Sequence, residues 1–396
     1  MDQRLVMADI SVWAYPWDLH DMGIDAAVAT LTVQGVDMIS LATSYHAGRF
    51  LQPGNPKRRV WFPQDGTVYY SVDDARWEGT EIKPLQADIV ATEGDYLGEL
   101  VARRDTGGTK VSCWTVCLHN TRLGMAHPDH VMRTAQGDPH FYALCPSSPA
   151  ARAYVTGMAA EISHRYRPDR IELESPDFMG FDHGFHHEKD GLGLLAEDRF
   201  LLGVCFCDHC MTRARSAGVP AEAARDRVNA LLDADFAREL PRPQFSGFPQ
   251  QALDAFRDTP DLHAYLVWRT EPVATLIAEI RASTHPATQL LVIDAEGSWW
   301  GGVDLGRIAP HCDGVLYCVY AVPAPRITPL LAGVRRVIGP AKILIAGYQL
   351  FYPEVADAVD LRDRVSAATG LADGFNFYNL GLVPAQRLHW IGAACR

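Results

Sequence analysis

The sequence has 396 residues but no apolar run of about 18 residues, which a transmembrane helix needs. It also lacks a block of Lys and Arg, and its net charge is −12. We therefore expect neither a membrane nor a nucleic acid as partner. The stretch MDQRLVMADISVWAYPWDL has no basic segment followed by a long apolar run. This absence predicts no signal peptide and a cytoplasmic protein.

Motifs of common cofactor-dependent and metal-dependent enzymes are missing as well. No Gly-rich phosphate-binding fingerprint follows a predicted strand, which argues against a dinucleotide-binding fold. The first predicted strand reads ADISVW and lacks a His-x-His pattern, which disfavours a metal-dependent amidohydrolase. We expect no organic cofactor.

Eight short segments rich in β-branched and aromatic residues predict buried strands. Most are near-continuous apolar runs, which is typical of parallel strands covered on both faces. The segments are 5–13, 36–45, 110–119, 170–175, 289–295, 314–320, 342–348 and 374–379. Helical patterns lie between and after them, at 23–34, 148–165, 262–282, 327–338, 353–368 and 384–394.

This alternation predicts an α/β fold, a (β/α)8 TIM barrel that occupies residues 1–396 as a single domain. An open, doubly wound sheet is the alternative. Long loops follow the second strand, at 46–83, and the fourth strand, where about 176–260 form an insertion. Both leave the carboxyl ends of strands, where barrel enzymes place their active sites, so we expect them to be functional.

The fourth predicted strand, RIELES, carries two acids. Side chains alternate along a strand, so Glu172 and Glu174 point the same way, into the barrel and near its mouth. Carboxylates there must be paired, hydrogen-bonded or hydrated. A structural ion pair with Arg or Lys is one interpretation, and a catalytic pair is the other.

The fifth strand repeats this arrangement with Asp294 and Glu296, followed by two tryptophans. Two acids on neighbouring strands suit glycoside hydrolysis, in which one carboxyl protonates the leaving oxygen and the other attacks or activates water. We predict Glu174 and Glu296 as the pair, with Glu172 assisting. Aromatic residues gather at the predicted strand ends, as in a sugar site. The predicted substrate-binding residues are Asp9, Trp13, Tyr45, His46, Arg49, His119, Asp294, Trp299, Tyr320, Gln349 and Asn376.

The motif CFCDHC places Cys205, Cys207 and Cys210 within six residues. Such thiolates can bind one metal ion, and zinc is the usual choice for a structural site. The fourth ligand is open between Cys145, His209 and the histidines 183, 186 and 187 of DHGFHHEK. Three reduced thiols without a metal are the alternative.

Three features together resemble the glycoside-hydrolase-like TIM barrels of bacteria, which include β-galactosidase-like barrels with a zinc-binding Cys cluster. They are ALCPSSPAARAYVTGMAAEI, the acid-ended fourth strand, and CFCDHC. The resemblance covers most of the chain. It implies an O-glycosyl hydrolase in which Glu174 is acid/base or nucleophile, and metal binding by the three cysteines of CFCDHC.

The chain departs from the large retaining clan of that group. Its fourth strand reads Glu-Leu-Glu-Ser in place of Asn-Glu, and its seventh strand ends near Gln349 without a Glu. The second acid must then come from elsewhere, which is why Glu296 is predicted. Two other functions stay open on the same barrel: a metal-dependent sugar isomerase or epimerase, and an inactive carbohydrate-binding barrel. In each case the partner is a small carbohydrate or glycoside.

Overall fold

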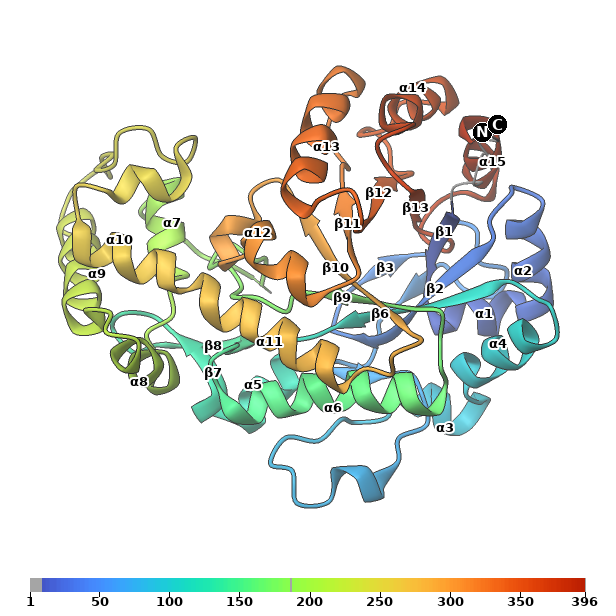
Figure 1. Ribbon diagram of the computed structural model, residues 1–396, viewed down its shortest axis with the longest axis horizontal. Coiled ribbons are helices and arrows are strands. Elements are labelled where there is room, and N and C mark those ends of the chain that lie inside the picture. Colours follow the sequence, from blue (N-terminus) through green and yellow to red (C-terminus); the bar gives the residue numbers. More distant parts are fainter. Residues whose placement is uncertain (1–8, 186, 396) are drawn as a thin grey trace.

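The computed structural model describes residues 9–185 and 187–395, and Figure 1 shows the arrangement of their elements. Eight parallel strands form a barrel, and they match the eight predicted segments. They are β1 (Asp9–Ala14), β2 (Met38–Tyr45), β6 (Lys110–Val116), β9 (Arg170–Glu174), β10 (Gln289–Ala295), β11 (Gly314–Cys318), β12 (Ile343–Gln349) and β13 (Gly374–Tyr378). Positions 5–8 of the first predicted segment lie outside the described residues.

The barrel closes because β1 pairs with both β2 and β13. Each remaining strand pairs with the next barrel strand along the chain, always in parallel. This closed order confirms the predicted (β/α)8 barrel and excludes the open, doubly wound sheet. The carboxyl ends of all eight strands therefore meet at one mouth.

Alternate residues of each strand face the barrel interior and the helix layer, as the pleat requires. The outward residues join the large apolar core, for example Val12 of β1, Ile171 of β9 and Val292 of β10. The inward residues belong to a second, aromatic-rich cluster that includes Trp13 and Trp114. Because both faces are buried, the strands read as apolar runs in the sequence.

Helices cover the barrel from outside (Figure 1). Those that follow the strands are α1 (Pro16–Met22), α2 (Ile24–Thr32), α3 (Asp88–Glu93), α4 (Tyr96–Asp105), α6 (Pro149–Arg165), α11 (Thr270–Ser283), α12 (Leu305–Ile308), α13 (Ala324–Ile338), α14 (Ala358–Ala368) and α15 (Ala385–Ala394). The single helix predicted at 262–282 is two helices, α10 (Pro260–Trp268) and α11. Pro272 explains the break, because it has no N–H to donate to the carbonyl of Trp268.

Three excursions leave the mouth of the barrel. After β2, the chain forms β3 (Phe50–Leu51), β4 (Val60–Trp61) and β5 (Thr67–Val68), and β5 pairs antiparallel with β2. After β6 come α5 (Thr121–Ala126), β7 (Val131–Arg133) and β8 (Pro139–Leu144), an excursion that was not predicted. After β9 come α7 (Ala196–Leu202), α8 (Asp208–Ser216), α9 (Ala221–Phe236) and α10.

The last two excursions form a lobe beside the barrel, at the left of Figure 1. They are joined by hydrogen bonds from the Phe206 amide to the carbonyl of Arg133 (2.8 Å) and from the Asn229 side chain to the carbonyl of Ala135 (3.3 Å). No helix in the described part of the chain is long and apolar enough to cross a membrane.

Candidate active site

A cavity of about 400 Å³ opens at the mouth of the barrel. Its lining comes from the carboxyl ends of most barrel strands and from the loops after β9 and β10. We call it the cup; its lining includes Trp13, Tyr45, Trp114, Glu174, Ser175, Asp177, Asp294, Ser298, Cys318, Tyr320 and Tyr378. Barrel topology alone brings these residues together, because strands distant in sequence end at one mouth.

Aromatic rings form the walls of the cup. Trp13 stacks on Trp114 with ring centroids 5.1 Å apart, and Tyr320 stacks on Tyr378 at 6.1 Å. The buried hydroxyl of Tyr15 lies 3.1 Å from that of Tyr45 and 2.9 Å from that of Tyr378. This network holds the tyrosines in place, so the cup offers preformed flat apolar faces with polar edges.

The two tryptophans each hold one glutamate of β9. The indole N–H of Trp13 donates to Glu172 over 2.7 Å, and the indole N–H of Trp114 donates to Glu174. Glu172 is fully buried, also accepts from the Ser40 hydroxyl at 3.1 Å, and does not line the cup. Glu174 lines it. The two acids point the same way, as predicted, but only Glu174 can touch a ligand in the cup.

Burial raises the pKa of Glu174 to about 7, and the hydrogen bond from Trp114 partly opposes the rise. The charge of Glu172 is not among the causes of this shift. The raised pKa of Glu174 therefore reflects poor solvation of its carboxylate, and not a second carboxylate beside it.

Two aspartates share the cup with Glu174. Burial raises the pKa of Asp294 to about 6, and neither of its buried carboxylate oxygens has a hydrogen-bond partner of normal geometry. Burial raises the pKa of Asp177 to about 7; the charges of Asp294 and Glu174 add to this rise, and Arg269 opposes it. The site thus holds three buried carboxyls with raised pKa values, and Asp177 lies within reach of the charges of the other two.

Glu296, predicted as the partner of Glu174, does not line the cup. The β9–β10 register pairs Glu172 with Leu291, so the inward residues of β10 are the odd-numbered ones. Glu296 has the outward phase and forms an ion pair with Arg326 (2.7 Å), with its side chain 53% exposed. Asp294 has the same phase but lies at the strand end, where the loop after β9 brings Asp177 beside it.

Two predicted ligand contacts lie deep in the barrel or at its opposite end. Asp9 is the first residue of β1, at the amino end of the strands, and forms ion pairs with Lys110 (2.8 Å) and Arg170 (3.2 Å). Asn376 is fully buried within the barrel and donates to the Ser11 hydroxyl (2.8 Å). Neither reaches the mouth, because each lies below the end of its strand.

The remaining predicted contacts surround the cup without lining it. His46 and His119 stack at 4.0 Å on the rim, and Arg49 is exposed beside them. Gln349 is buried at the end of β12, and Trp299 packs on Phe200 (5.2 Å) in the lobe. Four predicted contacts do line the cup, namely Trp13, Tyr45, Asp294 and Tyr320.

Sequence reasoning missed Asp177 and did not select Trp114 and Tyr378. Both aromatic residues belong to the group at the predicted strand ends, so a signal for them existed. Asp177 comes three residues after Glu174 in a loop, and no pattern marks its direction. It is positioned by contact with the backbone of Gly301, where an added Cβ would lie 2.0 Å from its Oδ2.

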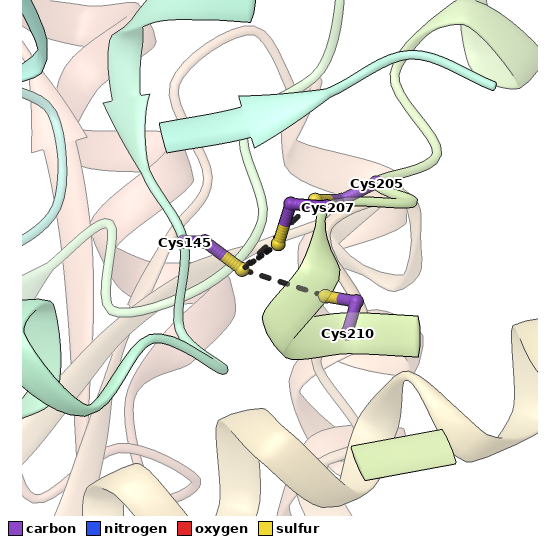
Figure 2. Close-up of side chains that lie close together, drawn as sticks. All are labelled: Cys145, Cys205, Cys207 and Cys210. Carbon is purple, nitrogen blue, oxygen red and sulfur yellow. Dashed lines mark hydrogen bonds between the residues drawn. The ribbon is translucent and has the colours of Figure 1, made fainter. Parts of the chain in front are cut away.

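Four cysteines form a separate cluster in the lobe (Figure 2). Cys145 follows β8, Cys205 and Cys207 lie in the segment that leads into α8, and Cys210 lies in the first turn of α8; all are buried. The sulfur of Cys145 lies 3.4 Å from that of Cys210, 3.5 Å from that of Cys207 and 3.9 Å from that of Cys205. Among the candidate fourth ligands Cys145 joins the group, whereas position 186 lies outside the described residues.

The four sulfur atoms all lie within 4.8 Å of one another, a spacing that suits one metal ion. A tetrahedral zinc site with Zn–S bonds of about 2.3 Å places its sulfurs about 3.8 Å apart. Backbone amides of Ser147 and Arg133 donate to Cys145 and Cys205, both over 3.4 Å, as expected around thiolate ligands. The donor set therefore fits a closed, four-sulfur metal site that leaves no open position.

No family model matches the sequence, and no curated protein matches it. Among solved structures, the chain is similar to a β-galactosidase of the haloarchaeon Halorubrum lacusprofundi (TM-score 0.57, 12% identity, 98% of this chain and 57% of that chain). It is also similar to the catalytic domain of a β-amylase of Paenibacillus polymyxa (0.55, 11%, 96% and 94%).

A third similar structure is α-L-fucosidase isoenzyme 2 of Paenibacillus thiaminolyticus (TM-score 0.52, 14% identity, 98% of this chain). The chain spans 49% of the length of that fucosidase. At these identities the similarity is one of fold, and it agrees with the closed barrel of eight parallel strands.

Proposed function

We propose that the protein is a glycoside hydrolase that acts on a small glycoside in the cup. The observation that carries this proposal is the convergence of Glu174, Asp177 and Asp294 inside one aromatic-walled cavity at the barrel mouth. Aromatic faces bind the apolar faces of sugars, and paired carboxyls supply the acid and base that glycosidic bond cleavage needs. The similar barrels named above carry glycosidase names, which supports the same reaction class.

The pKa values of the carboxyls in the cup are the basis on which we assign the acid and the nucleophile or base. Burial raises the pKa of Glu174 to about 7 and that of Asp294 to about 6, so Glu174 is the better candidate for the protonated carboxyl. A protonated carboxyl can donate to the leaving oxygen, while an ionised one can attack the anomeric carbon or activate water. We therefore assign Glu174 as the acid and Asp294 as nucleophile or base, in place of the predicted Glu296.

The other residues position this pair. Asp177 lies close enough to both carboxyls for their charges to raise its pKa, so we expect it to hold a proton when they are ionised. Trp13, Trp114, Tyr320 and Tyr378 would bind the sugar ring. Glu172 would not touch the substrate, but its hydrogen bond with the indole N–H of Trp13 holds that ring in place.

A metal-dependent isomerase is less favoured. Such an enzyme needs a group of carboxylates and histidines whose ligand atoms converge on one ion. Within the described residues, the only group of His, Cys, Asp or Glu side chains with such spacing consists of four cysteines and contains no carboxylate or histidine. For this cluster we propose zinc, held by Cys145, Cys205, Cys207 and Cys210, with a structural role: it would tie the excursion after β6 to the one after β9.

The test is hydrolysis of a panel of aryl glycosides, followed by three variants assayed on the best substrate. Glu174→Gln and Asp294→Asn should each lower kcat by orders of magnitude, whereas Glu296→Gln should leave kcat near wild type, because Glu296 lines the neighbouring cleft and not the cup. NMR of the first product anomer assigns retention or inversion. A Glu296→Gln loss as large as that of Asp294→Asn would refute the assignment, and absence of turnover on every glycoside would refute the function.

A further inference from the structure

A second and larger cavity, of about 790 Å³, lies in the lobe beside the cup. It lies between the β7–β8 hairpin and the segment that runs from Phe181 into α7. Three phenylalanines of its lining, Phe141, Phe181 and Phe185, remain 36%, 37% and 51% exposed. Exposed aromatic rings gathered around one cavity are typical of a ligand site.

This cavity connects to the cup. A cleft of about 550 Å³ lies between them; it shares Ser175, Asp177 and Ser298 with the cup, and Asp182 and His183 with the second cavity. A single groove therefore leads from the three carboxyls to the phenylalanines. A ligand whose sugar occupies the cup would extend its leaving group along this groove.

His140 indicates what the far end of the groove recognises. The residue is only 6% exposed and lines the cavity, yet neither of its ring nitrogens has a hydrogen-bond partner. Burial lowers the pKa of His140 to about 4, so the ring is neutral and offers one donor and one acceptor. A buried polar group of this kind costs stability unless a ligand or water satisfies it.

The ring of His140 also stacks on that of Tyr142, with centroids 5.5 Å apart and planes at 15°. Phe181 lies 5.9 Å from His140. The site thus has a stacked His140–Tyr142 pair with the ring of Phe181 beside it, tilted by 47°. The charged side chains nearby include both signs, and Arg199 faces Asp190 at 3.8 Å, which favours a neutral ligand.

We propose that this groove binds the aglycone of the substrate, and that the aglycone is a flat, neutral, aromatic group carrying a hydroxyl or carbonyl that hydrogen-bonds to His140. The inference rests on the proposed function, because it places the leaving group relative to the cup. It narrows the substrate class from small glycosides to glycosides of aromatic alcohols.

The first experiment measures binding of free 2-naphthol, an aromatic alcohol, to the purified full-length chain by calorimetry. We expect saturable binding that Phe181→Ala weakens three- to tenfold and His140→Phe, which keeps the ring but loses both nitrogens, weakens five- to tenfold. Phe62→Ala is the matched control, since Phe62 is a 67% exposed phenylalanine that does not line the groove. Equal affinity in all variants, or no saturable binding, would overturn the inference.

The second experiment compares a 2-naphthyl glycoside with the methyl glycoside of the same sugar. Phe181→Ala should raise KM for the naphthyl compound three- to tenfold and leave KM for the methyl compound unchanged. If methyl glycosides are turned over but naphthol does not bind, the proposed aglycone site is refuted while the proposed hydrolase stands. Binding of naphthol that depends on Phe181, without turnover of any glycoside, refutes the proposed hydrolase instead.

Discussion

Replacing Trp114 by Phe should move the alkaline limb of the activity profile to higher pH. The variant keeps an aromatic ring in the cup but removes the N–H that donates to Glu174. That hydrogen bond stabilises the ionised carboxylate, so its loss raises the pKa of Glu174 further above about 7. Under the proposed assignment of Glu174 as the acid, we expect activity to persist to a higher pH.

The size of the shift follows from the strength of the bond. A hydrogen bond to a charged group contributes about 1.5 to 3 kcal/mol, and one pKa unit corresponds to about 1.36 kcal/mol. Complete loss would thus raise the pKa by about one to two units. Glu174 keeps some exposure to the cup, so water replaces part of the bond, and we expect about one unit.

The assay is the pH dependence of kcat/KM on an aryl glycoside, with NMR titration of the Glu174 carboxyl carbon as a readout independent of activity. Trp13→Phe is the matched control. It removes the equivalent N–H from Glu172, so it should lower stability and leave the alkaline limb in place. An unmoved limb in Trp114→Phe, or an equal shift in both variants, would refute the reasoning.

Two further predictions concern stability. Purified protein should carry about one zinc per chain by elemental analysis; Cys207→Ser should lose the metal and lower Tm, whereas Cys395→Ser, outside the cluster, should change neither. Metal-free protein with unchanged Tm would contradict this expectation. Asp294→Asn and Glu174→Gln should each raise Tm by a few degrees at pH 8, but much less at pH 4.5. Burial raises the pKa of both carboxyls in the folded state to about 6 to 7, whereas their pKa in the unfolded state is about 4. The folded protein is therefore destabilised as the pH rises through this window, and the variants remove that destabilisation. A rise in Tm of equal size at both pH values would contradict this prediction.

The barrel was predictable because its strands are buried on both faces and therefore read as apolar runs separated by helical periodicity. The shared direction of Glu172 and Glu174 followed from the alternation along β9. The level of a residue along its strand was less well predicted, and this misled the prediction for Asp9. Asp9 pairs with Gly374, the first residue of β13, so it lies at the amino end of the barrel and not at the mouth.

The sequence by itself determined the eight strands, the acids of β9, the aromatic residues at the strand ends and the three clustered cysteines, since each depends on local spacing. Only the tertiary structure decided which acid shares the cup with Glu174. Asp294 and Glu296 have the same phase on β10, and what separates them is the position of Asp294 at the strand end, beside the loop that carries Asp177. It also decided that Cys145 completes the cysteine cluster and that a groove leads from the cup to His140. These relations join segments far apart in the chain, and no local pattern encodes their distance in space.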